Sequence, residues 1–432
     1  MKLCIIGTGY VGLVSGACFS DIGNKVICVD IDKNKIKKLN SGLIPIYEPG
    51  LDELVKKNFT QKRLSFTTDI DEAIKKSDII FICVGTPTNK KTNTADLKYV
   101  FQAANRISKN INSFKIIVNK STVPVTTGDK IELILKSKNK NKNFEVVSNP
   151  EFLREGEAIR DFIYPDRVVV GTNNNRANKI MKSLYLPIIK KVTRYFHTSR
   201  RGAELVKYAS NAFLATKIAF INELANLCEK TSVDIKDISL GMGLDQRIGE
   251  RFLRAGPAYG GSCFPKDTRA LAKTADKFKI DLSIVKNVIK SNEKRKHLLI
   301  YKINEIIGKN IKNKKITFLG VTFKPNTDDM REASSLIMIP YLSKKGANIK
   351  YFDPTGEKNN LKRFKNVEFC RSISSACKKS DLIIIHTEWN EFKQLNFKKL
   401  VGKKNFKIYD LRNLYSIKKM SKDKIKYFGV GR

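Results

Sequence analysis

The sequence has few acidic residues, few histidines and no long apolar run. Its 432 residues carry 42 Asp and Glu against 82 Lys and Arg, so the formal net charge is +40. A basic surface attracts polyanions. The lysines are scattered over every segment, however, and no aromatic-interleaved basic motif stands out, so a specific nucleic-acid-binding function is not expected. The three histidines and eight cysteines form no zinc spacing and no CxxC pair, so no metal site is expected.

The longest apolar stretches have the length of a strand rather than of a membrane span. Examples are DIIFICVG at 78–85 and DLIIIHT at 381–387. The N-terminal MKLCIIG begins a strand at once and shows no secretory signal. We therefore expect a cytoplasmic protein that does not enter a membrane. With 41% hydrophobic residues, the chain can form the cores of two or three domains.

The first thirty residues contain a dinucleotide-binding pattern. An apolar strand leads to Gly7, Gly9 and Gly12, and a helix and a second strand follow, ending at Asp30. Glycines at this spacing permit a tight turn and the close approach of a pyrophosphate to a helix N-terminus. Asp30 suits the ribose hydroxyls and repels a ribose phosphate. The pattern predicts NAD rather than NADP as the ligand.

Alternating apolar strands and helical segments predict an α/β fold with two doubly wound Rossmann-like domains. Thr86, Pro87, Ser121 and Thr122 follow apolar strands, where ligands meet the carboxyl ends of a parallel sheet. The second half repeats the α/β pattern without the glycine fingerprint, so it is expected to bind something other than a dinucleotide. Expected strands lie within 1–7, 78–88, 115–123, 144–153, 314–323, 347–354, 381–389 and 406–413.

Residues 199–230 predict a long helix that is apolar on most sides. Such a helix is expected to be buried, either as a bridge between domains or against its twin in a dimer. Lys207 and Asn211 are four residues apart, so both point the same way from this helix. The expected domains are an NAD-binding domain at 1–196, a central helical domain at 197–300 and a second Rossmann-like domain at 301–432.

The segment YGGSCFPKD at 259–267 places a cysteine at the expected start of a helix. Pro265 suits the first helical turn, and the positive end of a helix favours a thiolate. Cys263 is therefore a candidate nucleophile, although a lone cysteine can also be a small buried hydrophobe. The other seven cysteines lie mostly in apolar segments and are expected to be core thiols. Glu151 and Glu155 would share one face if their turn is helical.

An NAD domain combined with a nucleophilic cysteine indicates a particular class of chemistry. Oxidation of an alcohol to an acid passes through an aldehyde, which must be converted to a species that can lose a second hydride. Addition of a thiolate gives that species, a thiohemiacetal, whose oxidation yields a thioester that water can hydrolyse.

The whole chain resembles the nucleotide-sugar 6-dehydrogenases. The resemblance rests on GTGYVGL, VGTPT, STVPVTTG, NPEFLREGEAIRDF, ELVKYASNAFLATKIAFINE, GLDQRIG, GGSCFPKD and GVTFKPNTDDMREA in family order. It implies NAD-dependent oxidation of UDP-glucose to UDP-glucuronate, because SCFPKD and FKPNTDD are similar to the glucose type. Two alternatives stay open: the same chemistry on GDP-mannose or UDP-N-acetylmannosamine, and a non-catalytic binding protein that kept the dinucleotide fold.

The resemblance also implies roles for individual residues. Cys263 is expected as the nucleophile, Lys207 and Asn211 as stabilisers of the oxyanion, and Asp267 as the partner of the lysine and water. Glu151 is expected to be the base that activates water, with Thr122 positioning it. The residues expected around NAD are Gly7, Gly9, Tyr10, Val11, Gly12, Asp30, Lys35, Thr86, Pro87, Ser121, Thr122, Glu155, Lys266 and Arg331. Those expected around the sugar nucleotide are Phe152, Leu153, Lys207, Asn211, Arg247, Tyr259, Gly260, Phe264, Lys324 and Arg412. Arg247 is expected to reach the active site of a neighbouring subunit in a homodimer.

Overall fold

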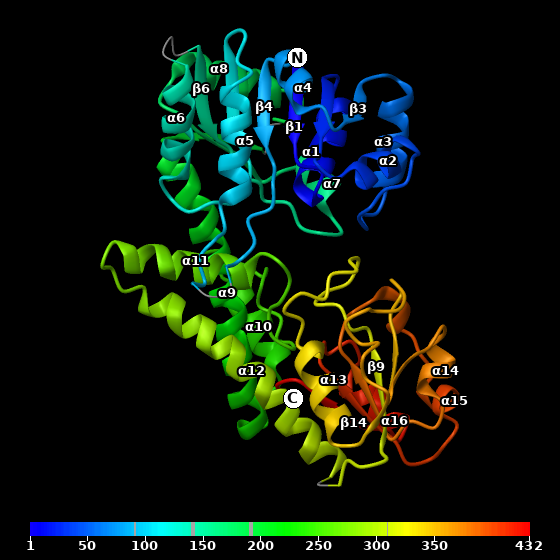
Figure 1. The fold of residues 1–432 in the computed structure, drawn as a ribbon. Coiled ribbons are helices and arrows are strands. Elements are labelled where there is room, and N and C mark those ends of the chain that lie inside the picture. The colour runs from blue at the N-terminus through cyan, green and yellow to red at the C-terminus, as the bar shows by residue number, and fades with distance from the viewer. Residues whose placement is uncertain (90–91, 140–142, 190–192, 309) are drawn as a thin grey trace. The chain divides into compact units, whose positions relative to one another are not determined.

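The computed structural model describes residues 1–89, 92–139, 143–189, 193–308 and 310–432. The chain forms two compact units. The first contains residues 1–210 and 273–280, and the second contains residues 211–272 and 281–432. The long helix α9 (Arg200–Thr231) supplies residues to both units. Figure 1 shows the elements of each unit.

The first unit is built on an eight-stranded sheet in the order β3-β2-β1-β4-β5-β6-β7-β8. Its strands pair in parallel except for β6 and β7, which are antiparallel. The strands are β1 (Lys2–Ile6), β2 (Lys25–Val29), β3 (Leu64–Thr67), β4 (Ile79–Ile82), β5 (Lys115–Asn119), β6 (Phe144–Ser148), β7 (Arg167–Gly171) and β8 (Arg194–Thr198).

Successive side chains of a strand point to opposite faces of the sheet, and in these strands the residues on both faces are apolar. Helices therefore cover both faces. Leu3 and Ile5 of β1 pack into one core, and Cys4 and Ile6 pack into another on the opposite face. The helices of this unit are α1 (Tyr10–Asp21), α2 (Lys33–Asn40), α3 (Leu51–Thr60), α4 (Ile70–Lys75), α5 (Lys98–Ser108), α6 (Thr127–Lys138), α7 (Ala158–Ile163) and α8 (Asn175–Tyr185). The first core receives side chains of α1, α7 and α8, and the second receives side chains of α4, α5 and α6.

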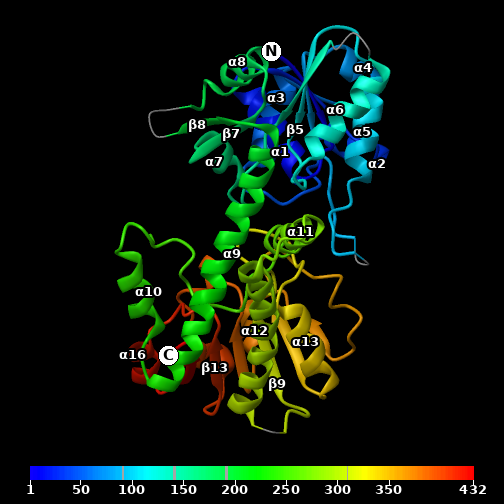
Figure 2. The same ribbon diagram turned by 90° about the vertical axis from the view of Figure 1, so that its left-hand side faces the viewer.

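The second unit has a six-stranded parallel sheet in the order β11-β10-β9-β12-β13-β14. The strands are β9 (Lys315–Leu319), β10 (Asn348–Phe352), β11 (Val367–Phe369), β12 (Leu382–Ile385), β13 (Lys407–Asp410) and β14 (Lys426–Gly429). Figure 2 shows α12 beside α13, and both contribute to the core on one face of this sheet. The helices are α10 (Ile235–Gly243), α11 (Phe264–Lys277), α12 (Ser283–Ile307), α13 (Ser335–Lys344), α14 (Ile373–Cys377), η1 (Asn390–Phe392), α15 (Phe397–Val401) and α16 (Ile417–Lys422).

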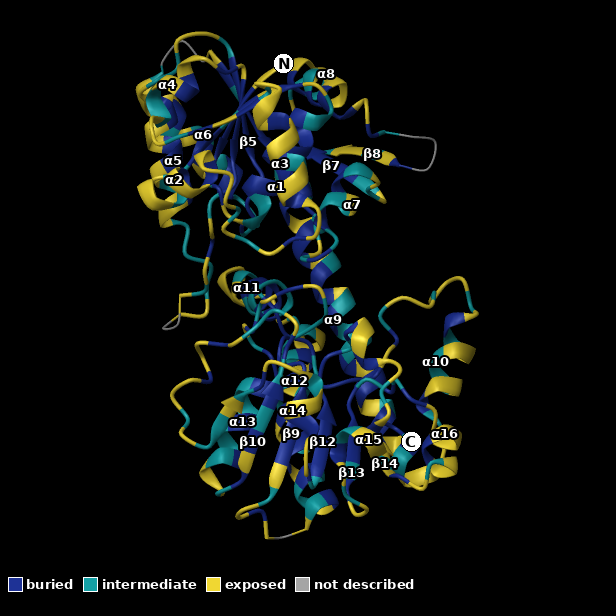
Figure 3. Cartoon of the chain, turned by 90° about the vertical axis from the view of Figure 1, so that its right-hand side faces the viewer, coloured by how far each residue is buried: buried dark blue, intermediate teal, exposed yellow. Residues whose placement is uncertain are grey.

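The structure confirms the predicted fold class, with two Rossmann-like sheets and a long central helix. Every strand predicted from an apolar run is present, and Figure 3 shows the central strands as buried. Strands β3, β7, β8, β11 and β14 were not predicted. The β8 segment RYFHT, for example, is exposed at an edge of the sheet and carries no apolar run. Within the described residues, no helix is both long and apolar enough to cross a bilayer.

In the single chain, α9 is buried on one side rather than on most sides. Ile221, Ala225 and Cys228 pack into the core of the second unit. Phe213 and Leu227, by contrast, are 66% and 57% exposed, and Phe220 lies midway between them and is also exposed. A spacing of seven residues places these three side chains on one face of the helix, about two turns apart. The helix therefore has one buried face and one exposed apolar face.

Candidate active site

The glycine turn after β1 has the shape that a dinucleotide requires. Gly7 has φ +100°, and a Cβ on it would lie 2.8 Å from the carbonyl oxygen of Cys83. A Cβ on Gly12 would lie 1.9 Å from the Gly7 oxygen, so neither position accepts a side chain. Gly9, which caps α1, has nothing within 4 Å of the same point. Open space at a helix N-terminus fits the pyrophosphate of NAD.

Asp30 is held at the end of β2 by three donors. Its Oδ2 accepts hydrogen bonds from the Thr8 amide at 2.9 Å, the Thr8 hydroxyl at 2.7 Å and the Lys35 ammonium at 3.0 Å. Burial opposes ionisation, but these donors and the Asp32 amide together hold the pKa of Asp30 below its ordinary value. The carboxylate is therefore ionised where a ribose would bind. Lys35, predicted as a cofactor residue, contacts this carboxylate directly.

The predicted cofactor residues after β4 and β5 meet at one edge of the sheet. The Thr86 hydroxyl donates to the Thr122 carbonyl oxygen at 2.9 Å. The Ser121 hydroxyl donates to the Val84 carbonyl oxygen at 2.8 Å. Two loops that are distant in sequence are thus held side by side at the carboxyl ends of the strands, where ligands bind in this type of sheet.

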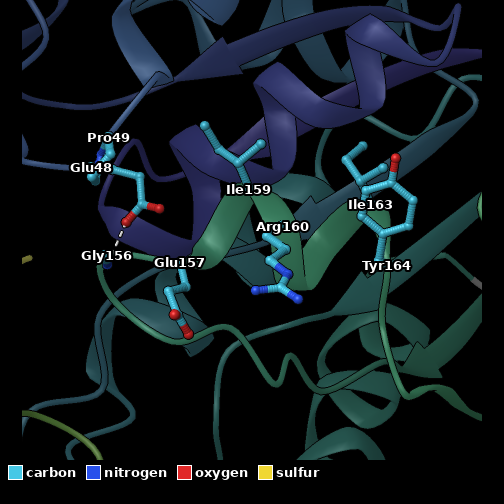
Figure 4. A pocket seen from close by; sticks show the side chains of 8 residues that line it. All are labelled: Glu48, Pro49, Gly156, Glu157, Ile159, Arg160, Ile163 and Tyr164. Atoms are coloured by element: carbon cyan, nitrogen blue, oxygen red, sulfur yellow. Dashed lines mark hydrogen bonds between the residues drawn. The ribbon is translucent and has the colours of Figure 1, made fainter.

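Tyr10 and the segment after Glu155 are joined through Glu48, which the sequence analysis missed. The Tyr10 hydroxyl donates to the Glu48 carboxylate and accepts from the Gly156 amide at 2.7 Å. Glu48 also accepts from the Gly156 and Ala158 amides, at 2.6 and 2.7 Å. It lies in the wall of a pocket of about 430 Å³, which Figure 4 shows beside α7. In the sequence, only its place as an acidic residue in the turn YEPG could have indicated that Glu48 belongs to the site.

Glu151 and Lys207 form a buried ion pair. The Lys207 ammonium lies 3.0 Å from Oε1 of Glu151, and the two side chains are 4% and 5% exposed. Oε2 of Glu151 accepts the Leu153 amide at 2.5 Å. The ring of Phe152 lies 5.1 Å from the same ammonium and 4.1 Å from the Arg167 guanidinium. The structure thus places four of the predicted site residues, Glu151, Phe152, Leu153 and Lys207, in one cluster.

The turn over Glu151 and Glu155 is not helical, so the condition for a shared helix face is not met. Residues 151–154 have no regular secondary structure, and α7 begins only at Ala158. Pro150 has no amide hydrogen, and the Glu151 side chain binds the Leu153 amide within its own turn. A side chain that captures a nearby amide competes with helix formation. Glu151 and Glu155 therefore do not share a helix face.

Lys120 is a second residue that the sequence analysis missed. Its side chain is buried after β5, with the ammonium 3.3 Å from Oδ1 of Asn149 and 3.2 Å from the Tyr185 hydroxyl. Burial lowers the pKa of Lys120 to about 8. Lys120 and Asn149 directly follow the apolar strands β5 and β6, two residues before Thr122 and Glu151. That placement was the available signal.

In the second unit, Cys263 immediately precedes α11, as predicted. The Asp267 amide donates to the Cys263 carbonyl oxygen at 2.8 Å, which is a hydrogen bond of the first helical turn. Cys263 is partly exposed, whereas the other seven cysteines are buried. The expectation of seven core thiols and one accessible thiol is confirmed. A partly exposed cysteine at a helix N-terminus has the surroundings of a reactive residue.

Gly260 and Gly261 let the cysteine loop pack closely on the loop after β9. A Cβ on Gly260 would lie 2.8 Å from the Glu332 carbonyl oxygen, and one on Gly261 would lie 2.6 Å from the Phe323 ring. The Gly261 amide donates to the Arg331 carbonyl oxygen at 2.8 Å. The two glycines therefore bring the Cys263 loop against the segment that carries Lys324.

Asn211, Lys266 and Asp267 form a second cluster in this unit. Asp267 is fully buried, and its two oxygens accept the Asn211 amide and the Lys266 ammonium, each at 2.6 Å. Residues 211 and 267 lie on different helices, α9 and α11. A buried carboxylate thus fixes the amide of Asn211 near the start of the helix that follows Cys263.

The arginines predicted to contact substrate (Arg412 and Arg247) or NAD (Arg331) differ in their surroundings. Arg412 donates to the carbonyl oxygens of Phe323 at 2.7 Å and His386 at 2.9 Å, so it lies against the segment that carries Lys324. Arg331 pairs with Asp329 at 2.8 Å, and its side chain is 64% exposed. Arg247 pairs with Asp245, and its side chain is 89% exposed. Arg412 is thus held in a defined place, whereas Arg247 extends into solvent in the single chain.

Comparison with known proteins gives full-length matches. Three models of the UDP-glucose/GDP-mannose dehydrogenase family match: the NAD binding domain at 1–189, the central domain at 201–294 and the UDP binding domain at 317–417. A UDP-glucose 6-dehydrogenase of Rhizobium meliloti is 46% identical over 435 residues, with all of both chains covered. UDP-glucose 6-dehydrogenase TuaD of Bacillus subtilis is also 46% identical, with all of this chain and 93% of the relative covered.

The fold comparison agrees with these matches. The structure of a UDP-glucose dehydrogenase from Pyrobaculum islandicum superposes with a TM-score of 0.91 at 33% identity, covering 99% of this chain and 97% of the other. The family's NAD binding domain coincides with the part of the chain that carries the glycine turn and Asp30. The chain therefore belongs to the UDP-glucose/GDP-mannose dehydrogenase family.

Proposed function

We propose that this NAD-dependent oxidoreductase converts the C6 hydroxymethyl group of UDP-glucose to a carboxylate, with Cys263 holding the sugar covalently between two oxidations. The observation that carries the proposal is the setting of Cys263: a partly exposed thiol at the start of α11, beside the buried pair of Asn211 and Asp267. Such a thiol has no packing role comparable to that of the seven buried cysteines.

The reaction needs two hydride acceptors and one water for each sugar. Bound NAD accepts the hydrides. Loss of the first hydride and a proton from the alcohol gives an aldehyde, and the Cys263 thiolate adds to its carbonyl carbon. Loss of the second hydride from this thiohemiacetal gives a thioester, and attack by water releases the acid and the thiol. In total, UDP-glucose, two NAD and water give UDP-glucuronate and two NADH, with release of protons.

The chain supplies donors for the oxygen that becomes negative at each covalent step. Lys207 and Asn211 lie one turn apart on α9, and a cation with an amide donor suits an oxyanion. Asp267 orients the Asn211 amide, and in our proposal it also acts as a partner of the lysine and water. Glu151 takes the proton of the attacking water, positioned by Thr122. The Lys207 ammonium lies 3.0 Å from this carboxyl group.

NAD and sugar nucleotide are each assigned mainly to one terminal domain, with further contacts from the other domains. We propose an NAD-binding domain at 1–196, a central domain at 197–300 and a UDP-sugar domain at 301–432. Glu155, Lys266 and Arg331 are assigned to the NAD side. Phe152, Leu153, Tyr259, Gly260, Phe264, Lys324 and Arg412 are assigned to the sugar nucleotide. The packing of the Cys263 loop and Arg412 on the segment of Phe323 supports the second group.

A homodimer is part of the proposal. Phe213, Phe220 and Leu227 form an exposed apolar row on α9. Leu240 of α10 is 59% exposed, and Leu244, which directly follows α10, is 70% exposed. A second copy of this chain would bury these side chains. In such a dimer, we propose that the exposed side chain of Arg247 reaches the active site of the neighbouring subunit.

Glucose is preferred over the alternative sugars because the curated relatives at 46% identity are named for UDP-glucose. Structures named for UDP-N-acetylmannosamine dehydrogenases align at lower identity, such as 26% for the Pyrococcus horikoshii protein. The test is NADH formation with UDP-glucose, UDP-galactose, GDP-mannose and UDP-N-acetylmannosamine. The proposal expects UDP-glucose to give the highest kcat/KM. Absence of NADH with all four would support the non-catalytic alternative.

A further inference from the structure

Glu204 is a buried carboxylate outside the predicted site residues. It lies in the first turns of α9, is 3% exposed, and binds three donors from two other segments. Its Oε2 accepts the Thr126 amide at 2.8 Å. Its Oε1 accepts the Gly128 amide at 2.7 Å and the Ser148 hydroxyl at 3.0 Å. The single carboxylate therefore connects α9 to the start of α6 and to the end of β6.

The start of α6 is shaped to receive this carboxylate. The cap residue Thr126 has φ +79°, which is unfavourable for a β-branched residue, and its own side chain does not cap the helix. A Cβ on Gly128 would lie 2.9 Å from Oε1 of Glu204, so only glycine leaves the carboxylate its place. Glu204 thus supplies, from another helix, the cap that α6 lacks.

Each of the three connected segments carries one residue of the proposed hydrolysis step. Lys207 follows Glu204 by three residues on the same helix. Ser148 ends β6, three residues before Glu151. Thr126 ends the loop that begins with Ser121 and Thr122. We propose that ionised Glu204 is the positioning residue that holds Lys207, Glu151 and Thr122 in their mutual places; this inference rests on the function proposed above.

The charge on Glu204 changes near neutral pH. Burial raises the pKa of Glu204 to about 7, the three donors oppose this rise, and the nearby charge of Asp129 adds to it. The other charged groups around it are Glu132 on α6 and Arg200 and Arg201 on α9, and both arginines pair with Asp129. The group that β6 places against Glu204 is the neutral hydroxyl of Ser148. A protonated carboxyl carries no negative charge, so its hydrogen bonds to the three donors are weaker, and the clamp is strongest above this pH.

The first test is Glu204→Gln, which keeps the size of the side chain and removes its ionisation. We expect kcat at pH 8 to fall about 10- to 100-fold, because small misplacements of catalytic groups cost rate on this scale. The KM values for NAD and UDP-glucose should change less than about threefold, since Glu204 binds neither ligand in our proposal. The acid limb of the kcat profile near pH 7 should disappear. A folded variant with unchanged kcat and an unchanged acid limb overturns the proposal.

Asp129→Asn gives a matched test with a defined sign. Loss of the Asp129 charge lowers the pKa of Glu204, so the acid limb should move to lower pH while kcat at pH 8 is kept. A limb that stays in place contradicts the assignment to Glu204. Gly128→Ala serves if Glu204→Gln does not fold, because its methyl group displaces the carboxylate without removing the charge. It should lower kcat as Glu204→Gln does, and full activity would contradict the proposal.

A measurement without substrates separates this inference from the proposed function. Hydrogen exchange of the Thr126 and Gly128 amides should be slow at pH 8 in the wild-type protein and at least about tenfold faster in Glu204→Gln. Equal exchange in both proteins means that Glu204 does not clamp α6. If wild-type protein oxidises no sugar but the exchange difference is present, the proposed function fails and the clamp stands.

Discussion

The Lys207 ammonium and the Glu151 carboxylate lie 3.0 Å apart and are almost completely buried. A buried ion pair costs desolvation on both sides, so breaking it leaves an uncompensated charge. Lys207→Met should therefore lower the free energy of unfolding by about 3 kcal/mol, measured by urea denaturation at pH 8. Lys207→Met combined with Glu151→Gln should recover most of this stability but not the activity. Equal losses in the single and double variants would contradict the pairing.

Asp30 should determine the preference for NAD over NADP. Its ionised carboxylate at the end of β2 would repel a ribose phosphate. The wild-type protein should therefore show a kcat/KM at least about 100-fold higher with NAD, equivalent to roughly 3 kcal/mol. Asp30→Ala should reduce the ratio mainly by losing affinity for NAD. Equal kcat/KM values for the two cofactors in the wild-type protein would refute the role of Asp30.

Lys324 should contribute to sugar-nucleotide affinity without affecting NAD. It follows Phe323, which contacts both Gly261 and Arg412. Lys324→Ala should weaken UDP-glucose binding about tenfold or more, as expected for loss of a charged contact to phosphate, and leave the Kd for NAD unchanged. Calorimetry with each ligand tests this. The exposed Lys418→Ala is the control, and it should bind both ligands normally. A similar loss for both ligands in Lys324→Ala would mean that its role was misassigned.

Glu204 should make the protein less stable as the pH rises from about 4.5 to 7. Its pKa is raised in the folded state, so the folded protein holds a proton that the unfolded chain has lost in this range. This contribution is present below pH 4.5, falls as the pH rises to about 7 and amounts to about 3 kcal/mol at most. The unfolding free energies of the wild-type protein and Glu204→Gln, compared between pH 5 and 8, test it. A difference that does not change with pH would argue against ionisation of Glu204.

The fold could be predicted largely because its strands are apolar runs that end in small or polar residues. The spacing of Gly7, Gly9 and Asp30 predicted the dinucleotide turn, because the backbone there needs residues without a side chain and an acid at the end of the second strand. The exposed row on α9 could not be predicted, because apolar residues on a helix do not reveal whether the chain itself covers them. Cys263 could be identified because Pro265 and the glycines indicate a helix start.

Residues that hold the site in place through long-range contacts could not be predicted from the sequence alone. Glu48 and Glu204 act through backbone amides that lie far along the chain, such as Gly156 and Gly128. Such contacts exist only once the chain has folded, and no spacing rule connects their partners. The turn at Glu151 is not helical for a local reason, since its side chain competes with the backbone for the Leu153 amide.

The central claim is that Cys263 carries the sugar as a thioester that Glu151 helps to hydrolyse. In Glu151→Gln the amide cannot take a proton from water, so the reaction should stop after both oxidations. Intact-mass analysis after mixing this variant with UDP-glucose and NAD should show one covalent UDP-sugar adduct that maps to Cys263. The double variant with Cys263→Ala should show none. An adduct that persists in the double variant, or one NADH per sugar in the wild-type protein, would contradict the account.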